Sequence, residues 1–189
     1  MSSFPTGTAT NFLLDSFARE RMTRSTRIER EVLDLFDLMR TRLLYYALSF
    51  GIPLEDGEDV VQETFFALFR HLQMERPREN LHGWLFRVTH HLALKRRLKI
   101  VAEVKRFVPD APESGALNPS PEELLLFQER HTRLGSALKA LPQVDQSCLR
   151  LRAEGLRYRE ISKILGISLG SVSASLVRSL ARLEQADRR

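Results

Sequence analysis

The chain has 189 residues, of which 43% are hydrophobic, and carries 29 Lys and Arg against 24 Asp and Glu, for a formal net charge of +5. This length and apolar content allow one large domain or two small ones, and the basic balance suits a polyanionic partner. The single cysteine, Cys148, excludes an intramolecular disulfide or a thiolate zinc site, and the lack of an 18-residue apolar run or a signal-peptide pattern predicts a cytoplasmic protein without membrane insertion.

Residues 1–26 are rich in Thr and Ser and contain one apolar cluster between Phe12 and Phe17. We interpret them as a mobile N-terminal extension with a single apolar turn; the alternative is a short amphipathic helix that packs on another surface. From about Arg27 to Phe50 the apolar residues follow a helical period, and Gly51 ends this predicted helix.

A second helix is predicted over residues 56–72, with Asp56 as its N-cap. Its inward stripe consists of Val61, Phe65, Leu68 and Leu72. Residues 55–63 at its start hold five acidic side chains and no basic one. In a basic protein this acidic patch is either a solvated helix start or a docking face for another protein.

A third helix is predicted to begin after Asn80, with Trp84 anchoring its buried side. The residues expected to face inward are Leu81, Trp84, Leu85, Val88, Leu92 and Leu98. The other faces carry Arg87, His90, His91, Lys95, Arg96, Arg97 and Lys99. Adjacent side chains on a helix diverge by about 100°, so we interpret His90 and His91 as polar surface residues and not as metal ligands. The basic run is either a solvated face or a nucleic-acid contact.

Residues 108–121 contain four prolines and few apolar residues. We assign residues 107–121 as a flexible linker between one domain at residues 27–106 and a second at residues 122–189. A helix is predicted to start after the Ser120 cap and to run to Leu141, and another to run from Pro142 to Gly155. The inward stripe here is Leu141, Val144, Cys148 and Leu151. Cys148 is therefore expected to be a core residue.

Residues 156–176 have the pattern of two short helices joined by a tight turn. Gly166 is placed to end the first helix in a left-handed conformation, and Ser168 is placed to cap the second. The expected inward residues are Leu156, Ile161, Ile164 and Leu165 on the first helix, and Val172, Leu176, Leu180 and Leu183 on the second. This pattern indicates either a DNA-binding helix-turn-helix, whose second helix enters the major groove, or an ordinary helical hairpin. With no convincing strand, the predicted fold is all-α, with two small helical domains joined by a flexible linker.

Three motifs in this order resemble regions of bacterial RNA polymerase sigma factors. Residues 58–65 (EDVVQETF) resemble region 2.2, residues 84–93 (WLFRV followed by LA) resemble regions 2.3 and 2.4, and residues 141–142 with 155–172 resemble region 4. A chain with only regions 2 and 4 is similar to the extracytoplasmic-function (ECF) group of the sigma-70 superfamily. The resemblance covers about residues 27–185, and it implies a sigma region 2-like domain followed by a region 4-like helix-turn-helix domain.

The resemblance implies a cytoplasmic bacterial transcription initiation factor that binds core RNA polymerase, through its β and β′ subunits, and directs promoter recognition and melting. It implies no catalytic residue, cofactor or metal, and it allows an anti-sigma factor or another recruiting protein as a further partner. The acidic helix start would dock on the clamp helices of the largest polymerase subunit. The expected core-polymerase-binding residues are Asp59, Gln62, Glu63 and Phe66.

The resemblance also implies two DNA-binding sets. The set for the minus-ten element, which would hold the melted non-template strand, is Arg78, Asn80, Trp84, Arg87, His90, His91, Lys95 and Arg96. The set for the minus-thirty-five element, which would bind double-stranded DNA, is Arg157, Arg159, Lys163, Ser168, Ser171, Ser173, Ser175 and Arg178.

At four of these positions the chain departs from the family pattern. Family members often have Asn and Asp where this chain has His91 and Lys95, and commonly have Lys and Arg where it has Ser173 and Ser175. Serine lacks the bidentate reach of arginine to guanine, so each lost contact would cost about 1–3 kcal/mol of discrimination. The helix-turn-helix then reads a different sequence, binds weakly, or is placed on DNA by another protein.

Two other functions are open at this point. A stand-alone helix-turn-helix regulator would explain the last fifty residues, but neither the acidic patch nor the basic tryptophan helix upstream. A polymerase adaptor with weakened minus-thirty-five reading would keep its polymerase contact and be placed on DNA by another protein. An enzyme is disfavoured, because the sequence contains no phosphate-binding glycine loop, HExxH motif or GxSxG motif.

Overall fold

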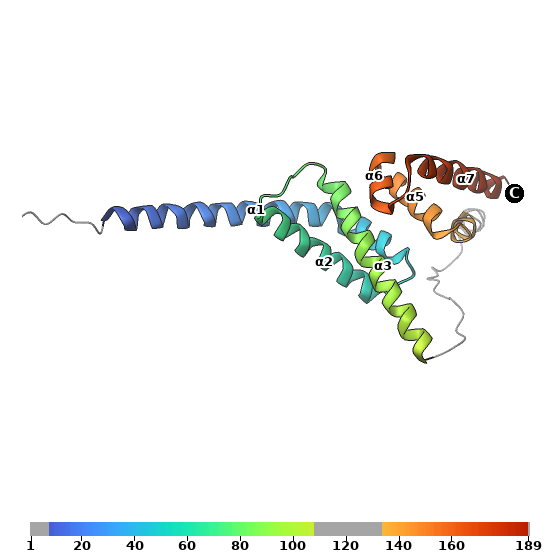
Figure 1. Cartoon of the computed structure of the whole chain (residues 1–189), viewed down its shortest axis with the longest axis horizontal. Coiled ribbons are helices and arrows are strands. Elements are labelled where there is room, and N and C mark those ends of the chain that lie inside the picture. Colours follow the sequence, from blue (N-terminus) through green and yellow to red (C-terminus); the bar gives the residue numbers. More distant parts are fainter. Residues whose placement is uncertain (1–7, 108–133, 189) are drawn as a thin grey trace, which may run out of the picture.

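The computed structural model describes the backbone of residues 8–107 and 134–188, with side chains over residues 22–103 and 134–188. Every regular element in these ranges is a helix, which confirms the predicted all-α class (Figure 1). In chain order the helices are α1 (Thr8–Leu48), α2 (Leu54–Gln73), α3 (Leu81–Phe107), a short helical stretch over residues 134–139, α5 (Gln143–Ala153), α6 (Tyr158–Leu165) and α7 (Leu169–Asp187). Within these ranges no single helix is long and apolar enough to cross a bilayer, and only the sharply bent pair of α6 and α7, taken together, has the required length and composition.

Helices α1, α2 and α3 contact one another and form the N-terminal unit (Figure 1). Gly57 lets the start of α2 approach α1 closely, because a Cβ atom there would lie 2.8 Å from Leu48 Cδ2. The stripe predicted for α2 is buried in this contact and consists of Val61, Phe65, Leu68 and Leu72. The helical period of the sequence therefore identified the face of α2 correctly.

Helix α1 extends further toward the N-terminus than the sequence indicated. It begins at Thr8, so the prediction of an extension with a single turn over residues 1–26 is wrong from Thr8 onward. Arg24 lies in this added part of α1, where its guanidinium is 2.5 Å from the Glu75 carboxylate and donates to the Gln73 carbonyl at 3.4 Å. These contacts tie α1 to the end of α2. The domain boundary drawn at residue 27 therefore falls inside a continuous helix.

The starts of α2 and α3 are capped in different ways. Pro53 occupies the cap position of α2, so the prediction of Asp56 as its N-cap is wrong. Asp56 instead accepts a hydrogen bond from Arg96 Nε of α3 at 2.5 Å. The cap predicted for α3 is present, since Asn80 Oδ1 accepts a hydrogen bond from Gly83 N at 3.1 Å.

The predicted inward face of helix α3 is confirmed in part, since Leu85 is buried and Leu81, Trp84 and Leu92 pack against the core. Its buried residues are Leu85, Phe86, Thr89, His90 and Ala93. The Thr89 hydroxyl lies 3.2 Å from that of Thr64 on α2, which places a small polar pair in the centre of this helix contact. Leu98 is 61% exposed, so its prediction as an inward residue is wrong, and Trp84 is only half-buried.

Helices α5, α6 and α7 form the C-terminal unit. Cys148 is buried, as predicted, whereas Val144 and Leu180 are 48% and 51% exposed, so their prediction as inward residues is wrong. Val172 and Leu176 of α7 are buried as predicted, and Ser175 and Ser179 are buried beside them, where small side chains suit the close contact of α7 with α5. The predicted linker and most of the helix expected after it fall within residues 108–133, outside the described residues, and their boundaries stay predictions.

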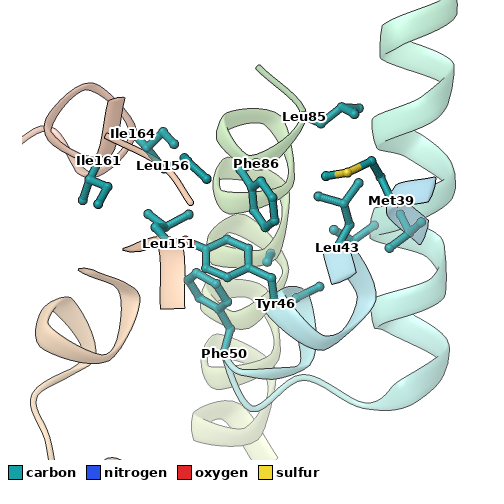
Figure 2. Close-up of a cluster of buried hydrophobic side chains, with 14 of the residues drawn as sticks. Met39, Leu43, Tyr46, Phe50, Leu85, Phe86, Leu151, Leu156, Ile161 and Ile164 are labelled. Atoms are coloured by element: carbon teal, nitrogen blue, oxygen red, sulfur yellow. The ribbon is translucent and has the colours of Figure 1, made fainter. Parts of the chain in front are cut away.

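The two units share one continuous apolar core. Figure 2 shows Leu151 and Leu156 of the C-terminal unit beside Tyr46, Phe50 and Phe86 of the N-terminal unit, and all five are buried. Burial of apolar side chains is the main favourable contribution to such contacts. The sequence pattern of two domains joined by a linker did not predict this contact.

Candidate functional site

The turn between α6 and α7 has the geometry of a helix-turn-helix. Gly166 ends α6 with φ of +67°, and Ser168 Oγ accepts a hydrogen bond from Ser171 N at 3.0 Å at the start of α7. Both predicted caps are therefore confirmed. The Ser162 hydroxyl donates to the Ile167 carbonyl at 2.6 Å and fixes the turn further. The two helices cross at 103°, within the range of helix-turn-helix units.

The exposed face of α7 carries no charged side chain before Arg178, whereas Arg178, Arg182 and Glu184 are exposed further along the helix. Ser173 is exposed, whereas Ser175 is buried and donates to Asp145 Oδ1 of α5 at 2.6 Å. The expectation that Ser175 faces DNA is therefore wrong, because its hydroxyl already has a partner inside the unit. Arg178 is the first basic residue of α7 and lies 3.3 Å from the same Asp145 oxygen. Serine hydroxyls and one tethered guanidinium are what α7 offers to a DNA groove in its first three turns.

The basic residues expected near phosphate lie on the surface of α6. Arg157, Arg159 and Lys163 are all exposed. Glu160 Oε2 accepts a hydrogen bond from Arg157 N at 2.5 Å and so orders the first turn of this helix. Sequence reasoning thus placed three of the cations correctly on the surface of the helix-turn-helix.

The acidic start of α2 forms a second exposed surface. Asp59, Gln62, Glu63 and Phe66 are exposed together on this helix, and the Phe66 ring is 58% exposed. Asp59 and Gln62 also line a shallow hollow between α2 and α1, opposite Phe36 and Arg40. An exposed aromatic ring is typical of a surface that binds another protein, and the carboxylates around it suit a partner surface that is basic.

A third surface lies on α3, where four of the residues expected to contact DNA are accessible. Arg87, His91 and Lys95 are exposed, and Trp84 is half-buried with its ring 4.7 Å from that of His71. His71 Nε2 lies 2.8 Å from the Pro77 carbonyl, which orders the loop before α3. Sequence reasoning missed His71, and the only available signal was its position at the end of the α2 pattern. Together these residues give a cationic strip beside an aromatic platform, which suits single-stranded nucleic acid.

The remaining members of the minus-ten set have partners inside the molecule. Arg78 pairs with Glu31 at 2.6 Å, Asn80 donates to Glu160, and Arg96 pairs with Asp56 and Asp59. The hydrogen bond with Asp56 is the largest cause that raises the pKa of Arg96.

His90 is buried, so its interpretation as a surface residue is wrong. Its Nδ1 lies 2.9 Å from the Tyr46 hydroxyl, and its ring lies 5.3 Å from that of Phe50. Burial is the main cause that lowers the pKa of His90 to about 4, and the neighbouring His91 adds to the shift. The imidazole is therefore neutral at pH 7.

Two family descriptions match this chain. Sigma-70 region 2 matches residues 35–100, and Sigma-70 region 4 matches residues 131–183. CnrH, an RNA polymerase sigma factor of Cupriavidus metallidurans, is 31% identical over 147 residues, which cover 72% of this chain and 76% of CnrH. The chain belongs to the sigma-70 family.

Other relatives of this sigma-70 family member carry ECF names, which confirms the resemblance drawn from the sequence. The ECF RNA polymerase sigma factor SigE of Mycolicibacterium smegmatis is 35% identical over 132 residues, which cover 68% of this chain and 50% of SigE. The ECF RNA polymerase sigma-E factor of Escherichia coli K12 is 27% identical over 165 residues, which cover 81% of this chain and 86% of that factor. The chain thus spans half of one relative and most of the others.

Two solved structures share the fold. The sigma factor RpoE of Bartonella quintana, solved in complex with the anti-sigma factor NepR, superposes with a TM-score of 0.66 at 22% identity and covers 83% of this chain and 96% of RpoE. CnrH, solved in complex with the cytosolic domain of CnrY, gives a TM-score of 0.55 at 23% identity and covers 87% of this chain and 92% of CnrH. At these identities the likeness concerns the fold alone.

Proposed function

We propose that this chain is a dissociable transcription initiation factor that binds core RNA polymerase and directs promoter recognition and melting. The acidic face of α2 docks on the polymerase, the cationic strip of α3 holds the melted minus-ten strand, and the helix-turn-helix lies on duplex DNA at the minus-thirty-five element. The factor acts in the cytoplasm by binding alone, with no catalytic chemistry of its own. An anti-sigma factor is a further partner, as for the sigma factor RpoE, whose structure in complex with the anti-sigma factor NepR shares this fold.

One observation carries the proposal, namely that three exposed surfaces of different chemistry lie on one chain. An acidic surface with an exposed ring suits a protein, a cationic strip beside Trp84 suits a single strand, and a helix-turn-helix suits a duplex. A stand-alone regulator would use only the last of these surfaces. An initiation factor uses all three.

The α7 surface bears on one part of the alternative function, namely weak reading of the minus-thirty-five element. Ser175 is buried, and no basic residue precedes Arg178 in this helix, so the side chains that α7 offers to bases are short and neutral. Short side chains give up the bidentate contacts with guanine that carry about 1–3 kcal/mol of discrimination each. We infer that minus-ten recognition dominates promoter choice.

The test is binding to core polymerase after charge reversal on α2. Asp59→Lys together with Glu63→Lys should abolish core binding, because both exposed carboxylates then repel a basic partner surface. Glu29→Lys together with Glu184→Lys is the matched control, since it changes the net charge equally at exposed positions far from α2 in sequence. Unchanged core binding by the α2 variant would refute the docking assignment. Binding to duplex DNA without any binding to core would favour the stand-alone regulator.

A further inference from the structure

The α2–α3 loop, residues 74–80, is exposed along its whole length and leads into the start of α3 (Figure 1). It contains two arginines, Arg76 and Arg78. Glu75 and Asn80 of this loop adopt left-handed backbone conformations, with φ of +55° and +54°. Residues other than glycine rarely adopt this conformation, and asparagine tolerates it better than glutamate does. The loop therefore needs contacts outside itself to keep this shape.

Helix α1 supplies two such contacts. The Arg24 guanidinium lies 2.5 Å from the carboxylate of Glu75, and Glu31 Oε2 accepts a hydrogen bond from Arg78 Nη1 at 2.6 Å. About two helical turns separate Arg24 from Glu31, so both side chains lie on the same side of α1. Both residues precede residues 35–100, the range that matches Sigma-70 region 2. The loop is thus held by a part of α1 that lies outside the family match.

A third contact joins the loop to the aromatic platform of α3. His71 Nε2 of α2 lies 2.8 Å from the Pro77 carbonyl, and the His71 ring is 4.7 Å from that of Trp84. The backbone N–H of Arg76 also donates to the His71 carbonyl at 3.2 Å. Trp84 is the only tryptophan of the chain. Its fluorescence therefore reports on the order of the loop.

The two arginines of the loop differ in what they are free to bind. Arg78 already makes a charge-assisted hydrogen bond with Glu31, which it would have to give up in order to reach a phosphate. Arg76 is exposed, and its guanidinium makes no ion pair or hydrogen bond within the described part of the chain. The loop thus carries one tethered cation and one free cation.

We propose that α1 holds the α2–α3 loop in place so that Arg76 contacts a phosphate of the melted strand. Arg24, Glu31 and Arg78 are positioning residues in this arrangement and do not touch DNA. This inference rests on the proposed function, because it concerns how the same strand is held. A loop that is ordered before the strand arrives loses less conformational entropy on binding. The contacts with α1 therefore raise the affinity for the strand.

A charge exchange at Glu31 and Arg78 tests the positioning role in the full chain bound to core polymerase. The probe is the labelled non-template strand of a promoter that the wild-type holoenzyme transcribes. Glu31→Arg should bind it about two- to fivefold more weakly than Glu29→Arg, the range of a partly exposed ion pair. Glu29→Arg is the matched control, because it adds the same charge at an exposed position of α1. Glu31→Arg together with Arg78→Glu restores opposite charges and should return the affinity toward that of the wild type.

The salt dependence of probe binding separates the two arginines. Each phosphate contact on a single strand contributes about 0.7 to the slope of log affinity against log salt concentration. Arg76→Ala should lower the slope by this amount, and Arg76→Lys, which keeps the charge, should retain it. The exchange of Glu31 and Arg78 should keep the wild-type slope. A lower slope in the exchange variant would show that Arg78 itself contacts DNA and would overturn its positioning role.

Acrylamide quenching of Trp84 in the free chain measures the order of the loop without DNA. Glu31→Arg should raise the quenching constant, because a loosened loop removes the Pro77 carbonyl from His71 and so frees the ring beside Trp84. The exchange variant should restore the wild-type constant. Arg76→Ala should leave it unchanged, since this side chain holds no other part of the described structure.

The outcomes separate this inference from the proposed function. If Glu31→Arg binds the probe as well as Glu29→Arg does, or shows wild-type quenching, the positioning role is wrong, while core binding and transcription still support an initiation factor. A wild-type slope in Arg76→Ala would overturn the phosphate contact. A chain that neither binds core polymerase nor yields transcripts would overturn the proposed function and this inference with it.

Discussion

The exposed faces of α3 and α7 differ in how each is equipped to hold DNA. Helix α3 presents Arg87, His91 and Lys95 to solvent, whereas α7 presents short neutral side chains before its first cation, Arg178. Cations on α3 give affinity for any phosphate backbone, and the half-buried Trp84 beside them gives a surface on which a base can stack. Helix-turn-helix geometry and strong readout of the base sequence are therefore separate properties. Here the geometry of α7 is complete, while base reading depends on serines.

The largest expected effect is on open-complex formation, after removal of two cations from α3. Arg87→Ala together with Lys95→Ala should lower open-complex formation about tenfold or more, and should reduce the salt dependence of DNA binding by about one unit of slope per removed phosphate contact. Core binding should be unchanged, since both residues lie on α3 and not on the acidic face of α2. The measurement is permanganate reactivity of the melted strand. Wild-type reactivity in the double variant would show that α3 does not hold that strand.

An intermediate effect is expected on base discrimination by α7. Ser173→Arg adds a long cation to an exposed position, so we expect a new dependence on one minus-thirty-five base pair, with a penalty for the wrong base of about 1–3 kcal/mol. The measurement is the affinity of the polymerase-bound factor for promoters that differ at single minus-thirty-five positions. Ser173→Ala is the control and should resemble the wild type. If wild type already discriminates strongly and Ser173→Ala removes this, then the serine face reads bases and the contrast with α3 is wrong.

The smallest effect is on the pH dependence of stability, where the two adjacent histidines of α3 are expected to differ. His90 is buried with its pKa lowered to about 4, so the folded state holds the neutral imidazole. The free energy that neutral His90 contributes to the folded state is fully present above about pH 6.5 and is lost as the pH falls toward 4. At pH 5 this loss lowers the free energy of unfolding by about 1–2 kcal/mol. Denaturant unfolding at pH 7.5 and pH 5 measures it. His90→Gln should remove this part of the pH dependence, whereas His91→Gln, at an exposed position, should leave it intact. Equal pH dependence in all three proteins would contradict the burial of His90.

Local chemistry explains which features the sequence predicted well. The αL conformation of Gly166 and the caps at Asn80 and Ser168 follow from interactions within a few residues, and the buried stripe of α2 follows the helical period of its own sequence. The exposed cations of α3 and α6 follow from the cost of burying a charge. These predictions hold because no distant partner competes with the local preference.

The errors arise where a distant partner decides. His90 lies among polar residues in sequence, but Tyr46 offers its ring nitrogen a buried partner 44 positions away. Ser175 was expected to face DNA, yet Asp145 of α5 draws its hydroxyl inward. Asp56 lies inside α2, which begins at Leu54, and its carboxylate binds Arg96, 40 positions further along. The periodicity of a single helix holds no information about partners that are distant in sequence. It therefore could not predict the contact between the N-terminal and C-terminal units either.

Run-off transcription with core RNA polymerase tests directly whether this chain is a transcription initiation factor. Core polymerase is incubated with fragments of genomic DNA, with and without the full chain. We expect discrete transcripts that appear only when the chain is added and that are lost with Asp59→Lys and Glu63→Lys together. The same transcripts with and without the chain would contradict its role as an initiation factor.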